Sequence, residues 1–201
     1  MPEDERLAPG MVGGYVLTGG SSRRMGRDKA LLAWRGTTLV QWIASQVREA
    51  VGNVTLVGTP DRYARLGLAA IGEDYPGLGP VSGLEAALRH STTDWNLVVA
   101  CDMPRLDAGA LTRLATAAVR YNAPVCAVRN HTGGLEPLCA VYHRGLLGEL
   151  SAALNEGRLK LRDLLARWDV VAWEPVDSVL TLNLNEPEDW DDLQRAGSSL
   201  R

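Results

Sequence analysis

Lysine and phenylalanine are nearly missing from this chain of 201 residues. Only two of its 21 basic residues are lysines, Lys29 and Lys160, and it contains no phenylalanine. The chain therefore uses arginine wherever a general positive charge is sufficient. A lysine in such a chain is a candidate for a specific task.

Cysteine is also scarce, with three residues, Cys101, Cys126 and Cys139. An odd number at wide spacing matches neither a disulfide framework nor a CxxC metal site. We interpret all three as small buried apolar side chains, which favours a reducing compartment, the cytoplasm.

We expect no segment that directs this chain to a membrane, and the sequence lacks a strong excess of positive charge. The first nine residues are polar and acidic, unlike a signal peptide, and no apolar run reaches roughly 18 residues. The net charge of −3 argues against a broad basic surface for nucleic acid. We expect a cytoplasmic protein with neither membrane nor nucleic acid as partner.

What is present is an alternation of apolar runs and amphipathic stretches. We expect a disordered lead-in at 1–12 and a single domain at 13–201. Strands are expected at 14–17, 54–57, 68–71, 95–100, 124–128, 135–142, 170–173 and 180–183. Helices are expected at 38–51, 61–66, 81–90, 108–121, 146–155, 159–168 and 187–195. This order predicts an α/β fold with a Rossmann-like, mostly parallel sheet and helices on both faces.

Ligands bind such sheets at the carboxyl ends of the strands, where three loops carry reactive side chains. The first loop runs from Leu17 to Lys29 and reads LTGGSSRRMGRDK. Its glycines, hydroxyls, arginines and one lysine suit a polyphosphate. The spacing is neither GxxxxGK[ST] nor GxGxxG. The alternative is a basic surface loop.

The other two loops are shorter. The segment Asp74–Leu84 reads DYPGLGPVSGL, and its glycines could let the backbone wrap a planar base; the alternative is a plain strand-to-helix turn. Asp102 follows the most apolar strand, where a carboxylate is well placed to bind Mg²⁺ together with phosphate oxygens. The alternative for Asp102 is helix capping, although Asp107 is better placed for that role.

These loops together resemble the molybdenum cofactor guanylyltransferases of the MobA type. Residues 17–32 match the signature LAGGxSxRMGxDKxLL, with Thr18 where alanine is usual. The second and third loops are similar to the family elements DxxPGLGPLSGL and CDxP. Weaker similarity continues through EPLCAVY at 136–142 and NLNEPED at 183–189, so that it covers nearly the whole chain.

The resemblance implies a nucleotide-diphospho-sugar transferase-like fold and transfer of GMP from GTP to molybdopterin, with Mg²⁺ as cofactor. The residues it assigns to GTP are Leu17, Thr18, Gly19, Gly20, Ser21, Lys29, Asp74, Gly79 and Asp102. The catalytic residues would be Lys29, Arg23 and Asp102, and Asp102 would hold the metal. Glu136, Asn183 and Asn185 would bind the pterin substrate, although ordinary turn chemistry is the alternative for the two asparagines. Transient contact with molybdoenzymes or other cofactor-biosynthesis proteins is a further expectation.

Gly19 favours GTP as the nucleotide. Related cytidylyltransferases usually read LAAG, with alanine at this position, and the missing methyl group leaves room for a purine. Two alternatives stay open: a nucleotidyltransferase that uses CTP or acts on another phosphorylated metabolite, and a nucleotide-binding protein without catalysis.

Overall fold

The computed structural model describes residues 8, 10–18, 28–177, 180–182, 184 and 189–190. Within them lies a seven-stranded sheet in the order β5-β4-β1-β6-β8-β7-β9. Its strands are β1 (Val12–Leu17), β4 (Thr55–Val57), β5 (Ala70–Ile71), β6 (Trp95–Ala100), β7 (Val125–Arg129), β8 (Leu135–His143) and β9 (Val170–Trp173). A small antiparallel hairpin is formed by β2 (Ala33–Trp34) and β3 (Thr37–Thr38).

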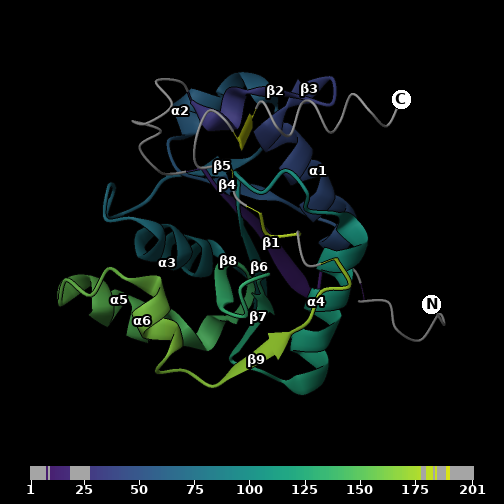
Figure 1. Ribbon diagram of the computed structural model, residues 1–201. Helices are drawn as coiled ribbons and strands as arrows, with labels where there is room; N and C mark the ends of the chain where they lie inside the picture. The colour runs from purple at the N-terminus through teal and green to yellow at the C-terminus, as the bar shows by residue number, and fades with distance from the viewer. Residues whose placement is uncertain are drawn as a thin grey trace.

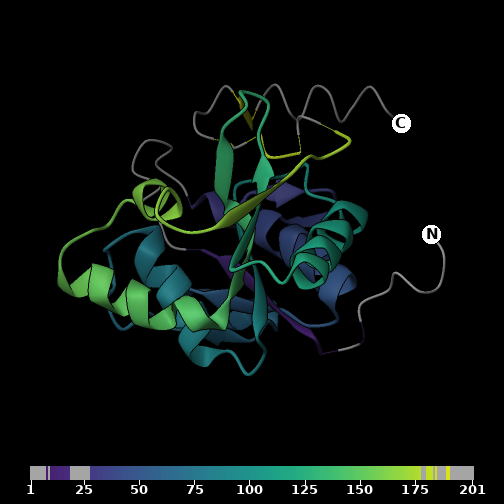
Figure 2. The same cartoon turned by 90° about the horizontal axis from the view of Figure 1, so that it is seen from below.

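The described helices are α1 (Leu39–Val51), α2 (Pro60–Tyr63), α3 (Pro80–His90), α4 (Ala108–Tyr121), α5 (Leu147–Asn155) and α6 (Leu161–Leu165). Short 3-10 turns form η2 (Lys29–Leu31), η3 (Ala64–Leu66) and η4 (Arg144–Leu146). Figures 1 and 2 show α1 and α4 on one face of the sheet and α3, α5 and α6 on the other. The predicted sheet with helices on both faces is confirmed.

Alternating side chains of β1 supply the two halves of the core. Val16 packs in the cluster with α1 and α4, whereas Tyr15 and Leu17 pack in the cluster with α3, α5 and α6. This period of two is the geometry of a strand that is buried on both faces. It explains why β1 is almost entirely apolar.

The first half of the sheet is parallel, and the second half mixes antiparallel and parallel pairs. β5, β4, β1 and β6 run parallel, β8 is antiparallel to both β6 and β7, and β9 is parallel to β7. From β1 the chain moves outward to β4 and β5, then returns to β6 on the other side of β1. The order therefore reverses beside β1, and such a reversal is where α/β sheets bind ligands.

Local sequence signals account for the best-predicted helices. The Thr38 hydroxyl accepts from the Gln41 N–H at the start of α1, and the Gln41 side chain accepts from the Thr38 N–H. Asp107 caps α4 by accepting from the Ala110 N–H at 2.9 Å, as expected. Such caps satisfy N–H groups that have no partner within the helix.

Several expected boundaries are wrong. β1 begins at Val12, a 1 % exposed residue that the sequence placed in the disordered lead-in. In the expected strand 180–183, Leu180 instead belongs to a turn, where its N–H donates to the Asp177 carbonyl. The expected helix 159–168 shortens to 161–165, because Lys160 has an extended backbone and a turn follows the last helical residue. The expected helix 187–195 lies mostly outside the described residues.

The β2–β3 hairpin was missed. Its strands have two residues each, too short for a periodic pattern, and its turn places Arg35 and Gly36 at positive φ.

Candidate active site

The ends of β1 and β6 bring two of the predicted loops together. Leu17 is level with Ala100 in the sheet, and the Cys101 N–H donates to the Leu17 carbonyl at 3.1 Å. The start of the first loop therefore lies beside Asp102. This adjacency follows from the parallel register of the two strands.

Thr18 ties the start of the first loop to β4. Its N–H and its hydroxyl both donate to the Val57 carbonyl, at 2.8 and 2.9 Å, and its side chain is buried. The backbone N–H of Thr18 is thus already used inside the protein. Any contribution of Thr18 to nucleotide binding must come from the way it places the start of the loop or from its own carbonyl oxygen.

Asp102 is the most unusual carboxylate of the site. Its Oδ1 atom is buried and has no hydrogen-bond partner among the described residues. Burial raises the pKa of the Asp102 carboxyl, and the nearby Lys29 ammonium opposes that shift. A buried acceptor without a donor is costly, which makes it a good ligand for a hard cation.

Lys29 and Asp102 meet at Leu184, in the segment expected to bind the acceptor. The Lys29 ammonium donates to the Leu184 carbonyl, and the Leu184 N–H donates to the Asp102 carbonyl at 2.9 Å. Residues from three distant parts of the chain are therefore joined in one place. The sequence analysis assigned a role to each segment but did not predict that they meet at Leu184.

Asp28 was not among the predicted site residues, although it stands next to Lys29 in the motif. Its carboxylate accepts from the Ala30 N–H at 3.1 Å and from the Tyr63 hydroxyl at 3.4 Å, and it pairs with Arg62 at 2.7 Å. Burial and the Asp28 charge raise the pKa of Tyr63 to about 12. Asp28 therefore fixes the backbone that carries Lys29.

The second loop is less closely joined to this group. Asp74 is exposed, and its described partner is Arg89, at 3.4 Å, rather than Lys29 or Asp102. Gly79 has φ +80°, a conformation that favours glycine, and stands immediately before α3. The loop reaches the start of α3 through this residue.

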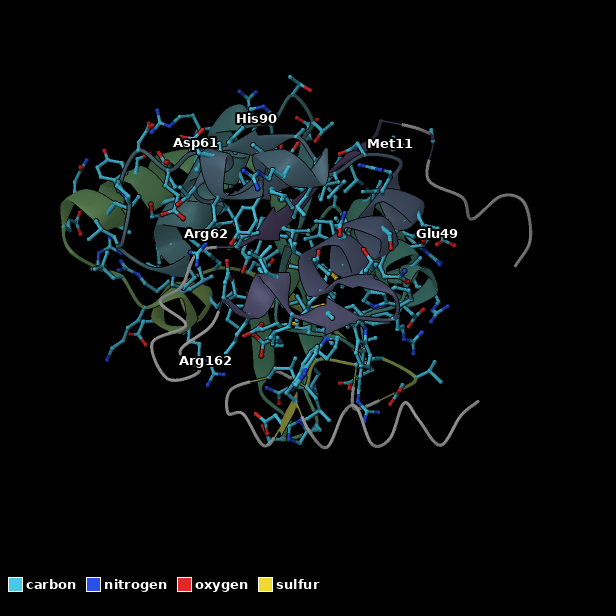
Figure 3. All side chains as sticks on the ribbon, turned by 90° about the horizontal axis from the view of Figure 1, so that it is seen from above. Met11, Glu49, Asp61, Arg62, His90 and Arg162 are labelled. Carbon is cyan, nitrogen blue, oxygen red and sulfur yellow. The ribbon has the colours of Figure 1, made fainter. Side chains whose placement is uncertain are left out.

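Glu136 lies in β8 with only 6 % of its surface exposed. Burial raises the pKa of its carboxyl; the Leu138 N–H and Arg162 oppose the shift, and Asp102 adds to it. Glu136 therefore lies close enough to Asp102 for the charge of Asp102 to affect its pKa. Arg162 was not predicted, and Figure 3 shows it on the same side of the molecule as Arg62, away from Glu49 of α1.

Several predicted site residues lie outside the described residues, and their placement is not part of the structure. They are Gly19, Gly20, Ser21, Arg23, Asn183 and Asn185.

The three cysteines carry no disulfide. Cys126 and Cys139 are buried as expected, but Cys101 is partly exposed, because it stands in the turn after β6 rather than within the sheet.

The residues present suit a metal held jointly with substrate. No cluster of three or more His, Cys, Asp or Glu able to hold a metal occurs among the described residues. Mg²⁺ commonly takes only one or two protein carboxylates and completes its shell with phosphate oxygens and water. The unpartnered Asp102 oxygen fits that arrangement.

Comparison with known proteins decides the family. Residues 14–172 match the family of the MobA-like NTP transferase domain. The chain belongs to the MobA-like NTP transferase family. It is therefore a nucleotidyltransferase, as the sequence predicted.

Similar proteins agree with this assignment to the MobA-like family. The "Probable molybdenum cofactor guanylyltransferase" of Opitutus terrae is 32 % identical over 92 % of this chain and 95 % of its own length. Molybdopterin-guanine dinucleotide biosynthesis protein A from Archaeoglobus fulgidus shares the fold, with a TM-score of 0.80 and 24 % identity over 93 % of this chain and 99 % of its own. Rv0371C from Mycobacterium tuberculosis H37Rv, solved in complex with manganese, has a TM-score of 0.67 and 20 % identity over 92 % and 98 % of the two chains.

Among the described residues of this MobA-like protein, no helix combines the length and apolar character needed to cross a membrane.

Proposed function

We propose that this protein transfers GMP from GTP to molybdopterin, releasing pyrophosphate. The observation that carries the proposal is the meeting of Lys29 and Asp102 at Leu184, after the end of β6, in a chain of the MobA-like family. The Oδ1 atom of Asp102 is buried there and has no hydrogen-bond partner among the described residues. The choice of substrates is supported by relatives named probable molybdenum cofactor guanylyltransferase, to which this chain is similar over most of their length.

In the proposed reaction, a terminal phosphate oxygen of molybdopterin attacks the α-phosphorus of GTP. The new P–O bond forms as the bond to the β-phosphate oxygen breaks, and pyrophosphate leaves with that electron pair. The phosphate nucleophile is anionic near neutral pH, so the protein needs no general base. Catalysis then rests on positioning and on neutralising charge.

The residues divide this work. Lys29, with Arg23, would neutralise charge on the α-phosphate and the leaving group, as a compact ammonium does well. Asp102 would hold Mg²⁺, which when bound neutralises charge on the phosphate oxygens. The manganese complex of a protein with the same fold supports the use of a divalent cation.

The acceptor would lie between β8 and the segment around Leu184. Glu136 is buried within electrostatic range of Asp102, and the Leu184 backbone is held by both Lys29 and Asp102. Asn183 and Asn185 flank Leu184 in sequence. Holding Leu184 in place would therefore help position both asparagines for the pterin.

Remaining nucleotide contacts are proposed for Leu17, Thr18, Gly19, Gly20, Ser21, Asp74 and Gly79. We propose the cytoplasm as the compartment, because three unpaired cysteines suit a reducing environment.

The deciding experiment incubates the purified protein with molybdopterin, Mg²⁺ and GTP, CTP or ATP in parallel, and measures pyrophosphate and the dinucleotide product. We expect product with GTP and at most slow turnover with the other two nucleotides. Equal turnover of CTP and GTP would contradict the base assignment. Activity with a sugar phosphate but not with molybdopterin would contradict the acceptor, and nucleotide binding without pyrophosphate release would contradict catalysis.

A further inference from the structure

Tyr63 is the last residue of α2, and its side chain lies beside the candidate active site. α2 begins at Pro60, three residues after β4 ends at Val57, and β4 pairs with the end of β1. Tyr63 is only 1 % exposed and packs in the core cluster with α1. The position of β4 in the sheet therefore brings this buried tyrosine to the edge where the proposed nucleotide site lies.

The Tyr63 hydroxyl contacts two acceptors at once. Its oxygen lies 3.4 Å from the Thr18 carbonyl oxygen and 3.4 Å from Asp28 Oδ2. A hydroxyl has one proton to donate, so the two acceptors share it. Thr18 and Asp28 stand on either side of residues 19–27, which lie outside the described part of the chain. One buried side chain therefore ties the end of β1 to the residue before Lys29.

The two acceptors are otherwise held by different parts of the fold. Thr18 donates its N–H and its hydroxyl to a carbonyl of β4, at 2.8 and 2.9 Å. Asp28 accepts from the Ala30 N–H at 3.1 Å through its other oxygen and so caps η2, the turn that begins with Lys29. The Tyr63 hydroxyl thus joins the sheet to the turn that carries Lys29.

The chemistry of α2 suits this linking role. Burial raises the pKa of Tyr63 to about 12, and the Asp28 charge adds to the shift, so the hydroxyl keeps its proton near neutral pH and can donate it. Arg62, the preceding residue, pairs with the same Asp28 oxygen at 2.7 Å. α2 therefore offers two neighbouring donors to one carboxylate oxygen.

We infer that Tyr63 is a positioning residue, whose hydroxyl holds the backbone of Lys29 where the Lys29 ammonium meets the phosphates of GTP. This inference rests on the proposed function, which assigns those phosphates to Lys29. Tyr63 itself would not touch the nucleotide, because it is buried in the core cluster with α1. It would act only through Asp28 and the turn that Asp28 caps.

Small errors of position are costly for a charged group that binds phosphate. A displacement of about 1 Å can lower a reaction rate by about 100-fold, even when the substitution lies away from the chemistry. Without the Tyr63 hydroxyl, η2 could shift relative to the end of β1, and the Lys29 ammonium would shift with it. The loss should therefore depend on the presence of Lys29.

A double-mutant cycle tests this dependence by nucleotide binding, without an acceptor. Calorimetry with Mg²⁺ and GTP would compare the wild type, Tyr63→Phe, Lys29→Ala and the double variant. Phenylalanine keeps the buried ring and removes only the hydroxyl. We expect Tyr63→Phe to weaken GTP binding by about 10-fold when Lys29 is present, and by less than about 2-fold in the Lys29→Ala protein, because residues that act through one another are not additive.

Tyr15→Phe is the matched control. It makes the same change on a tyrosine that is 4 % exposed and whose hydroxyl also lies 3.4 Å from a partner, His90 Nδ1. Tyr15 packs in the core cluster on the other face of the sheet, and His90 is the last residue of α3, away from the start of that helix. This variant should bind GTP as the wild type does, and thermal melts check the folding of every protein.

Asp28→Asn tests the same link from the other side if Tyr63→Phe does not fold. The amide oxygen can still cap η2 at the Ala30 N–H, as asparagine does well. The amide nitrogen then replaces the oxygen that Tyr63 and Arg62 contact, and a donor there meets two further donors. This variant should show the same dependence on Lys29.

Equal losses of GTP affinity with and without Lys29 would overturn the inference, because Tyr63 would then act on stability alone. Wild-type affinity in Tyr63→Phe, or an equal loss in Tyr15→Phe, would also overturn it. A protein that shows the expected dependence on Lys29 but transfers nothing to molybdopterin would overturn only the proposed function. A wild-type protein that binds no nucleotide would overturn both.

Discussion

Replacing Asp102 with asparagine should separate stability from activity. The change keeps the shape of the side chain and removes its charge. In the wild-type protein the Oδ1 atom is buried and has no hydrogen-bond partner in the described part of the chain, and burial raises the pKa of the carboxyl. The charged form is thus disfavoured in the folded state relative to the unfolded chain.

The magnitude follows from that burial. An unsatisfied buried polar group costs about 1–3 kcal/mol, and a charged one costs more than a neutral amide. We expect Asp102→Asn to stabilise the metal-free protein by about 1 kcal/mol, which for a chain of this size raises Tm by about 2–4 °C. Activity should fall by about 100-fold or more, because loss of a metal ligand removes several kcal/mol of transition-state stabilisation.

Mg²⁺ provides a second readout. A ligand at about 100 times its Kd stabilises the folded state by about 2.7 kcal/mol. Differential scanning calorimetry should therefore show Mg²⁺, with a non-hydrolysable GTP analogue present, raising the Tm of the wild type more than that of Asp102→Asn. Steady-state turnover with GTP is measured on the same samples.

Asp107→Asn is the matched control. Asp107 accepts from the Ala110 N–H as the cap of α4, and asparagine caps helices equally well. This variant should keep wild-type activity and Mg²⁺ response. Wild-type turnover of Asp102→Asn at limiting Mg²⁺, or an unchanged Mg²⁺-dependent shift in Tm, would refute the assignment of Asp102.

Three further predictions concern other residues. Lys29→Ala should lower kcat/KM for GTP by roughly 100-fold, about 3 kcal/mol, and Lys29→Arg should recover only part of that loss because the guanidinium directs its hydrogen bonds differently. The control is Arg120→Ala, which changes an exposed residue at the end of α4. Equal rates for all three variants would contradict the proposed role of Lys29. Thr18→Ala should lower Tm by about 2–4 °C, because it removes one hydrogen bond of about 1 kcal/mol. The variant should retain activity, because the backbone N–H of residue 18 still donates to the Val57 carbonyl. Loss of turnover would show instead that the Thr18 hydroxyl acts on substrate. Burial raises the pKa of the Cys126 thiol to about 11, so iodoacetamide at pH 8 should alkylate this thiol only after the protein unfolds. Mass spectrometry follows the labelling. Rapid labelling of the folded protein would contradict the burial of Cys126.

The sequence was most informative where local signals and periodicity agreed. The expected limits of β6 and α4, residues 95–100 and 108–121, match the structure, because a mostly apolar run and an Asp107 cap leave little choice. Short elements were harder to recognise. The β2–β3 hairpin has two residues in each strand, too few for a periodic pattern, and of the expected strand 68–71 only Ala70 and Ile71 pair with β4.

In the candidate site, too, some features could be predicted from local sequence and others could not. The motifs placed Lys29 in the loop after the first strand and Asp102 just after the end of another strand, and the structure brings the two residues together. What the motifs did not reveal is how each residue is held. The anchoring of Asp28 by Arg62 and Tyr63, and of Leu184 by Lys29, joins residues far apart in the chain. Only the tertiary structure determines such contacts.

The hydrogen bond between Lys29 and Leu184 spans 155 positions of the chain. Contacts of such long range form late in folding, because closing a long loop costs entropy before the contact can repay it. All seven strands of the described sheet end by Trp173, before Leu184 is reached. A growing chain released up to β9 would thus hold all seven strands of the described sheet while Lys29 still lacked this anchor. Completion of the site therefore waits for the last part of the chain to be synthesised.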